Sequence, residues 1–304
     1  MGEQLAKETS DFKESFVNII EDENNSRVSG VLANMRKSLW VAKIQWKILL
    51  NYKLSFILQI IDIVFNVLIY FFVGFLVSPS KLNDLGYGTD YAAFAITGIA
   101  LSRYIWISLT RITRRMQYEI DAGTLESIVV SGATMKIWII GQSIFGFLWS
   151  SVWFIGTILS AILIGINFYL SLFNLLEVLL IIILTVLAHV SIGIIFAALA
   201  IFHKQIDSVV LVVSFIMEFL GGVTYPLQLL SKIPGLYFLS QFVPFTHGIE
   251  LLRKVMLVNT SMFDSTLIYH TLVLIAYIPL IFLAFKVLGY YFEKARRLGE
   301  LGSY

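Results

Sequence analysis

Six apolar stretches, each long enough to cross a bilayer as a helix, constrain what this chain can fold into. A helix rises about 1.5 Å per residue, so roughly 20 apolar residues cross a hydrocarbon core of about 30 Å. The composition agrees, since 58% of the 304 residues are hydrophobic and only 14% are charged. The sequence therefore predicts an all-α integral membrane protein with six transmembrane helices. The stretches are residues 54–77, 91–109, 137–166, 175–202, 208–225 and 267–288.

Lysine and arginine are distributed unevenly among the segments that join these stretches. Eight precede the first stretch, four lie between the second and third, one follows the fourth and three follow the sixth, whereas the opposite face carries four. Cytoplasmic loops are enriched in these residues, so we expect both termini in the cytoplasm. The net charge of +2 is too small to indicate a nucleic-acid partner.

Outside the predicted spans and their loops, the chain has an acidic N-terminal segment, a predicted helix before the first span and a short C-terminal segment. Residues 1–30 hold seven acidic side chains, which predicts a solvated, partly mobile tail. In residues 31–52 apolar side chains recur at helical spacing beside a basic stripe, which favours an interfacial helix in contact with membrane lipid. The alternative is a cytoplasmic extension of the first span. The transmembrane domain then covers residues 31–290, and residues 291–304 form a cytoplasmic tail.

A polar segment, residues 111–136, separates the second and third apolar stretches. Its arginines and carboxylates exclude it from hydrocarbon, so it lies in water at one membrane face. Its first ten residues favour a helix, and Gly123 is a natural stop for that helix. We interpret the segment as a short docking element that faces the cytoplasm.

The loop between the fifth and sixth stretches is apolar but is broken by prolines and glycine. It is too interrupted to cross a bilayer and too apolar for water, so we expect a re-entrant helical hairpin in the outer leaflet. His247 and Glu250 stand three residues apart without further ligands at usable spacing, which predicts a solvated helix face rather than a metal site. The residues that mark the hairpin are Pro226, Pro234, Gly235, Pro244, Thr246, His247, Glu250 and Arg253.

Four ionisable residues, Asp62, Arg103, His189 and Glu218, fall inside predicted spans, where an uncompensated charge is costly. Counting residues places Asp62 about 12 Å and Arg103 about 9 Å from the cytoplasmic edge. We therefore expect an ion pair between the first two spans, with substrate contact as the alternative. Near mid-depth, His189 and Glu218 permit a proton relay, a neutral hydrogen-bonded contact, or a polar cavity lined by Glu218.

Two motifs resemble those of ABC-2 type transporter permeases. After the second span, this family carries a Glu, a short gap and Gly-Thr-Leu-Glu, followed by a turn that often contains Ser-Pro or Thr-Pro. Before its last span it carries a second recurrent segment, which PFTHGIELLRKVML resembles. The matching positions are Glu119, Gly123, Thr124, Leu125, Glu126, Ser131 and Gly132 in the first motif, and Pro244, Thr246, His247, Glu250 and Arg253 in the second.

The resemblance implies a multi-pass permease subunit of an ABC exporter in the plasma membrane. Such a subunit pairs with a second copy or a related permease and is driven by separate ABC ATPase subunits, which hold ATP and Mg²⁺. The expected substrates are amphipathic, lipid-like, drug-like or glycan molecules. Docking of the ATPase is expected at Arg114, Arg115, Glu119, Gly123, Thr124, Leu125 and Glu126.

The sequence lacks the residues that catalysis by this chain would need. It contains no G-x-x-x-x-G-K-[ST] phosphate loop, no cysteine, and no nucleophile, base and orienting group that one compartment could bring together. We therefore expect no enzymatic activity and no bound cofactor or metal. Two alternatives stay open: an ion-coupled secondary transporter that uses Glu218 and His189, and a scaffold without transport. The first and last three spans show no inverted repeat of broken helices, which disfavours the former.

Overall fold

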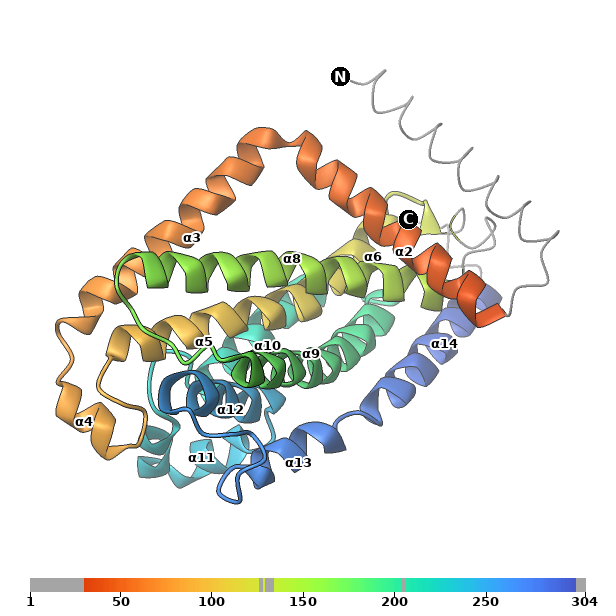
Figure 1. Ribbon diagram of the computed structural model, residues 1–304. Coiled ribbons are helices and arrows are strands. Elements are labelled where there is room, and N and C mark those ends of the chain that lie inside the picture. The colour runs from red at the N-terminus through yellow and green to blue at the C-terminus, as the bar shows by residue number, and fades with distance from the viewer. Residues whose placement is uncertain (1–29, 126–127, 129–133, 204–205, 299–304) are drawn as a thin grey trace.

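The computed structural model describes residues 30–125, 128, 134–203 and 206–298 (Figure 1). Most of the predicted acidic tail, together with Glu126, Ser131, Gly132 and the last six residues, lies outside the described part. Within these ranges the regular structure is helical, without strands, which confirms the all-α prediction. The elements are α2 (Gly30–Asn51), α3 (Lys53–Gly74), α4 (Pro79–Asp84), α5 (Tyr91–Trp106), the π-helical turn η1 (Ile107–Arg111), α6 (Ile112–Asp121), α8 (Met135–Leu163), α9 (Leu172–Ala200), α10 (Ile206–Gly221), the 3₁₀ turn η2 (Leu227–Lys232), α11 (Pro234–Ser240), α12 (Pro244–Val258), α13 (Ile268–Ala276) and α14 (Leu280–Leu298).

Among the described residues, five helices are long and apolar enough to cross a membrane. They are Lys53–Gly74, Tyr91–Asp121, Met135–Leu163, Leu172–Ala200 and Ile268–Leu298. The remaining predicted span corresponds to α10, whose 16 residues extend about 24 Å and fall short of a typical hydrocarbon core. The count of six spans therefore stays a prediction.

The helix that contains the second predicted span continues beyond that span. We predicted its end at residue 109, but α5, η1 and α6 form one continuous helix, Tyr91–Asp121. The helix ends where Gly123 adopts a φ of 65°, a conformation that a glycine reaches without steric cost. The first part of the polar segment, residues 111–121, thus continues the helix of the second predicted span.

The N-terminal helix α2 is separate from the first span. Tyr52 between them has a non-helical backbone, and α2 and α3 meet at an angle on one side of the bundle (Figure 1). Helix α2 packs along α8, where Gly141 permits close contact: a Cβ there would lie 2.5 Å from the Cβ of Val41. Beside this contact face, α2 exposes Met35 and Leu39. Its placement in the headgroup layer stays a prediction.

Helices α11 and α12 fill the space between α10 and α13, and α12 lies against α9, α5 and α10 as well. Near the start of α12, the ring of Phe245 lies 6.2 Å from that of His189. Near its end, Asn174 Nδ2 donates to the Val255 carbonyl at 3.2 Å. Helix α12 therefore runs back along about half of α9, as a re-entrant segment would, although its depth in a bilayer stays a prediction.

The expected solvated face of α12 is wrong, because His247 and Glu250 are both buried. His247 Nδ1 lies 2.9 Å from Nδ1 of His270, and its Nε2 lies 2.9 Å from the Gln241 carbonyl oxygen. Glu250 accepts a hydrogen bond of 2.7 Å from the hydroxyl of Tyr87. The prediction failed because neighbouring helices cover α12 on every side, so its polar face meets polar partners instead of water.

Candidate functional site

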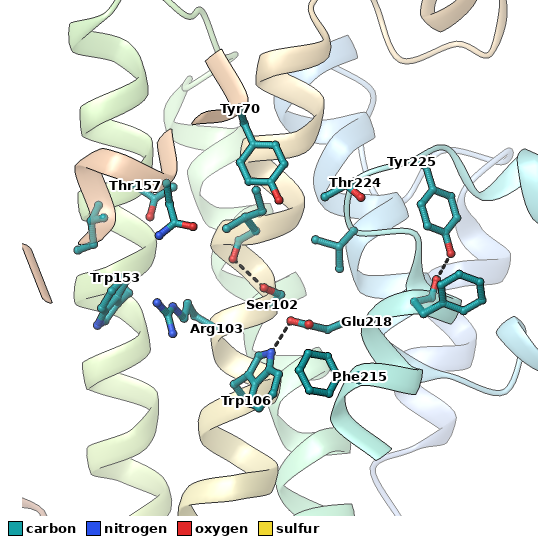
Figure 2. A pocket seen from close by; sticks show the side chains of 15 residues that line it. Tyr70, Ser102, Arg103, Trp106, Trp153, Thr157, Phe215, Glu218, Thr224 and Tyr225 are labelled. Carbon is teal, nitrogen blue, oxygen red and sulfur yellow. Dashed lines mark hydrogen bonds between the residues drawn. The ribbon is translucent and has the colours of Figure 1, made fainter. Parts of the chain in front are cut away.

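A cavity of about 410 Å³ lies between α3, α5, α8 and α10. Figure 2 shows the side chains that line it, which include both aromatic rings and polar groups. The turn of residues 223–225, which follows α10, forms one wall. The lining residues are Ile63, Asn66, Tyr70, Ile99, Ser102, Arg103, Trp106, Trp153, Thr157, Phe215, Glu218, Phe219, Val223, Thr224 and Tyr225.

An ion pair joins α3 to α5 beside this cavity. Arg103 Nη2 donates to Asp62 Oδ2 at 2.9 Å, so the ion pair expected from residue counting is present. The guanidinium of Arg103 also stacks on Trp153, 3.9 Å from the ring centroid, and Asn66 donates to the other carboxylate oxygen of Asp62. The side chains of Arg103 and Asp62 are 37% and 50% exposed. The pair thus lies on the outer face of this protomer.

Glu218 enters the cavity from α10, about 18 Å from the start of that helix. Its Oε1 accepts a hydrogen bond of 2.6 Å from Nε1 of Trp106, drawn in Figure 2. Phe215, one turn earlier, packs edge-on against the same indole ring. Of the three arrangements left open for Glu218, the cavity-lining one matches its position.

His189 lies elsewhere, inside the bundle. Its Nδ1 is 2.6 Å from the Thr185 carbonyl oxygen of its own helix, and its ring packs against Phe245. Its Nε2 is buried without a hydrogen-bond partner among the described residues. The structure therefore gives His189 and Glu218 different partners and does not bring them together as a relay would require.

Arg253 fixes the turn that closes one end of the cavity. Its buried guanidinium donates to the carbonyl oxygens of Phe94, Gly222 and Val223, at 3.2, 2.9 and 2.5 Å. It also stacks 3.4 Å from the centroid of the Phe94 ring. Tyr91 adds a hydrogen bond of 2.8 Å to the Thr224 carbonyl. The wall of residues 223–225 is thus held from two neighbouring elements.

A second network ties α12 to the loop before α5. Tyr87 is buried, and its hydroxyl donates to Glu250 and lies 3.0 Å from the Gln228 side chain. Burial and the adjacent Glu250 carboxylate raise the pKa of Tyr87 above its ordinary value. The phenol therefore stays protonated at physiological pH and remains a donor to the carboxylate. Sequence analysis identified Glu250 but missed Tyr87, which is 163 positions away.

The predicted docking element divides into residues that shape a turn and residues that face outward. Glu119 is buried; it pairs with Arg115 at 3.2 Å and accepts from the Thr124 hydroxyl at 2.5 Å. Leu125 is fully buried, and Gly123 supplies the positive φ of the turn. Of the predicted docking residues, Arg114, Gly123 and Thr124 are exposed, whereas Glu126 lies outside the described residues.

The most prominent outward side chain of α6 is one that sequence analysis missed. Tyr118 is 58% exposed and lies on the same helix face as Arg114 and Asp121, which are also exposed. The buried face of α6 carries Ile112 and Met116 instead. Spacings of three and four residues put positions 114, 118 and 121 on one side of a helix. This spacing could have predicted the exposed face of α6 from the sequence.

The π-helical turn η1 lies between the cavity and α6. It follows Trp106 directly, and the Thr110 hydroxyl donates back to the Trp106 carbonyl. Helix α9 approaches this turn closely, because a Cβ on Gly193 would lie 2.2 Å from the Ser108 carbonyl oxygen. π-Helical turns inside α-helices often occur at functional sites. Here the turn joins the outward face of α6 to the Trp106 and Glu218 contact.

Comparison with known proteins agrees with this arrangement. The ABC-2 type transporter family matches residues 39–257, which is well over half of the chain and includes the cavity, η1, α6 and nearly all of α12. No curated protein matches the chain. By this match the chain belongs to the ABC-2 type transporter family, the multi-pass, non-catalytic membrane permeases of ABC transporters.

Proposed function

We propose that this chain is the permease subunit of an ATP-driven exporter in the plasma membrane, with both termini in the cytoplasm. It moves amphipathic molecules, which are lipid-like, drug-like or glycan in character, out of the cell. Separate ABC ATPase subunits bind ATP and Mg²⁺ and supply the energy. The chain itself contributes the path and the surface on which those subunits dock.

The observation that carries this proposal is the outward-facing ion pair beside the cavity. Asp62 and Arg103 are partly exposed at a depth where lipid would surround an isolated protomer. Charged side chains inside a membrane face protein or water rather than lipid. A second permease, either another copy or a related chain, therefore covers this face and encloses a water-accessible path.

Helix α3 supports the same assembly. It is apolar enough to span a membrane, yet only 11% of its most apolar window is buried inside the protomer. Leu58, Phe65 and Phe72 are among its exposed side chains. Lipid and a second permease are the two environments that would accept such a surface. The position of Asp62 on this helix supports contact between the adjacent part of α3 and the second permease.

The energy input enters at the outward face of α6. An ATPase subunit that pushes on Tyr118 and Arg114 moves a helix that continues without a break to Trp106. A rigid element of this kind transmits displacement from a docking surface to a distant site. The displacement would pass through η1 to the cavity contact between Trp106 and Glu218.

Copurification from native membranes tests the docking step. Tyr118→Ala should reduce the yield of the copurifying ATPase about fivefold or more, equivalent to about 1 kcal/mol, because exposed tyrosines often anchor interfaces. Tyr237→Ala is the matched control, since Tyr237 is 40% exposed on α11, far from α6 in Figure 1. Equal ATPase yields from both variants would contradict docking on α6.

The rival function, an ion-coupled transporter, loses its structural support. A relay needs His189 and Glu218 to exchange a proton, but their hydrogen-bond partners are Thr185 and Trp106. Transport by the purified complex in vesicles should depend on ATP and persist when the proton gradient is collapsed. Transport that follows the gradient and ignores ATP would favour the rival.

A further inference from the structure

The charges around the cavity do not balance within the described residues. Arg103 is the cationic residue in the lining, and it is already paired with Asp62 at 2.9 Å. Glu218 has no ion-pair partner among the described residues and is held by the neutral N–H of Trp106. Asp62 lies beside the cavity rather than in its lining, so the region around the cavity holds two carboxylates, Asp62 and Glu218, and one cation, Arg103.

Aromatic side chains lie next to Glu218 in the cavity. Trp106 and Phe215 lie beside the carboxylate in Figure 2, with Tyr70 and Tyr225 farther along the same space. The negative faces of aromatic rings attract organic cations, most strongly where water is partly excluded. A carboxylate among such rings is suited to an alkylammonium group and poorly suited to an anion.

The size of the cavity restricts the ligand further. About 410 Å³ lies at the small end of the range for drug-sized ligands, about 300 to 1,000 Å³. A cationic head group fits this volume, with an apolar tail directed along the exposed surface of α3.

We propose that this cavity binds the ammonium group of a cationic amphiphile, with Glu218 as its counter-ion and Trp106 and Phe215 as its aromatic walls. The inference rests on the proposed transport function, because it names the substrate class of that same path. The ion-pair partner of Arg103 is Asp62, not Glu218. Trp106 and Ser102, both on α5, hydrogen-bond to the carboxylate and orient it in the cavity.

A pair of probes with equal shape and different charge tests this proposal. The first carries a dansyl group on a decyl chain that ends in trimethylammonium, and the second ends in the uncharged tert-butyl group. Binding is measured on the full chain in phosphatidylcholine nanodiscs, with empty nanodiscs subtracted. The ammonium probe should bind about tenfold more tightly than its isostere, since charge is the difference between them.

Variants then test which residues cause the preference for the ammonium probe. Glu218→Gln keeps the shape and the acceptor for Trp106, and it should reduce the tenfold preference to less than about twofold. Glu293→Gln removes a carboxylate on α14, outside the cavity, and should leave the preference unchanged. Phe215→Leu should weaken binding of the ammonium probe severalfold and leave binding of the isostere unchanged. This second variant tests the site even if Glu218→Gln does not fold.

Equal binding of the two probes to the wild-type chain would overturn the inference, as would a tenfold preference that survives in Glu218→Gln. These outcomes are separable from failure of the transport proposal, because ATPase copurification is measured independently. An intact ATPase complex without ammonium preference overturns the substrate class alone. Ammonium preference without any ATPase partner overturns the energy source and leaves the binding site standing.

Discussion

Buried polar side chains in this protein act as ties between segments that are distant in sequence. Arg253 on α12 reaches the carbonyls of α5 and of the turn after α10, while Glu250 reaches Tyr87. An arginine suits this position because its planar fork presents five donors in a fixed geometry. Gly98 leaves the required space, since a Cβ there would lie 2.7 Å from Nη2 of Arg253. Arg253 is therefore a main support of the turn that closes one end of the cavity.

Removing that tie should destabilise the fold. Arg253→Ala leaves the carbonyls of Gly222 and Val223 buried without this donor, and each such loss costs about 1 to 3 kcal/mol. Arg253→Lys should recover only part of this, because an ammonium cannot reproduce the fork. Thermal unfolding of the purified protein, followed by size-exclusion chromatography, measures the effect. Lys232→Ala, on the exposed turn η2, should leave the midpoint unchanged; an equally stable Arg253→Ala would refute the role of this tie.

At the scale of elements, the continuous helix Tyr91–Asp121 connects the docking face to the cavity. Its π-helical turn is packed against α9 at Gly193, where no side chain separates the two backbones. A turn of this kind stores an extra residue, so a modest rearrangement can rotate α6 relative to α5. The close contact with α9 holds the turn in its present form.

A methyl group at this contact should disturb the turn. Gly193→Ala places a Cβ about 2.2 Å from the Ser108 carbonyl, so one backbone must shift, at a cost of about 1 to 3 kcal/mol. ATP hydrolysis by the copurified complex should then respond less to added ammonium amphiphile. Gly289→Ala is the matched control, because nothing lies within 4 Å of its Cβ and alanine favours a helix. A stable Gly193→Ala variant with unchanged coupling would show that the contact is unimportant.

The features that sequence analysis predicted are those that depend on local spacing. Apolar periodicity located the helices, and counting residues along two spans placed Asp62 opposite Arg103. The continuity of α5 and α6 was missed, because polar composition ends a span in sequence but does not end a helix. The burial of His247 and Glu250 was missed for another reason. Their partners, His270 and Tyr87, are set by the packing of α12, which no local pattern encodes.

At the scale of the whole molecule, the two ends of the helical bundle differ in chemistry. One end carries α6 and the C-terminal part of α14, with Arg114, Arg296 and Arg297 exposed. The other carries α4 and α11, where Lys81 and Lys232 are the exposed basic residues. By the positive-inside rule, we expect the first end to face the cytoplasm. ATP is available on that side, so the whole mechanism depends on this orientation.

Chemical labelling checks the orientation directly, because the chain contains no cysteine that would interfere. Tyr118→Cys introduces a thiol on exposed α6, and Tyr237→Cys introduces one on exposed α11 at the other end. A membrane-impermeant maleimide added to intact cells should label Tyr237→Cys and spare Tyr118→Cys, and permeabilised cells should show both. The two variants replace the same residue type at similar exposure, so each controls for the reactivity of the other. Labelling of Tyr118→Cys in intact cells would place α6 outside, where no ATPase subunit can reach it, and the proposed energy coupling would fail.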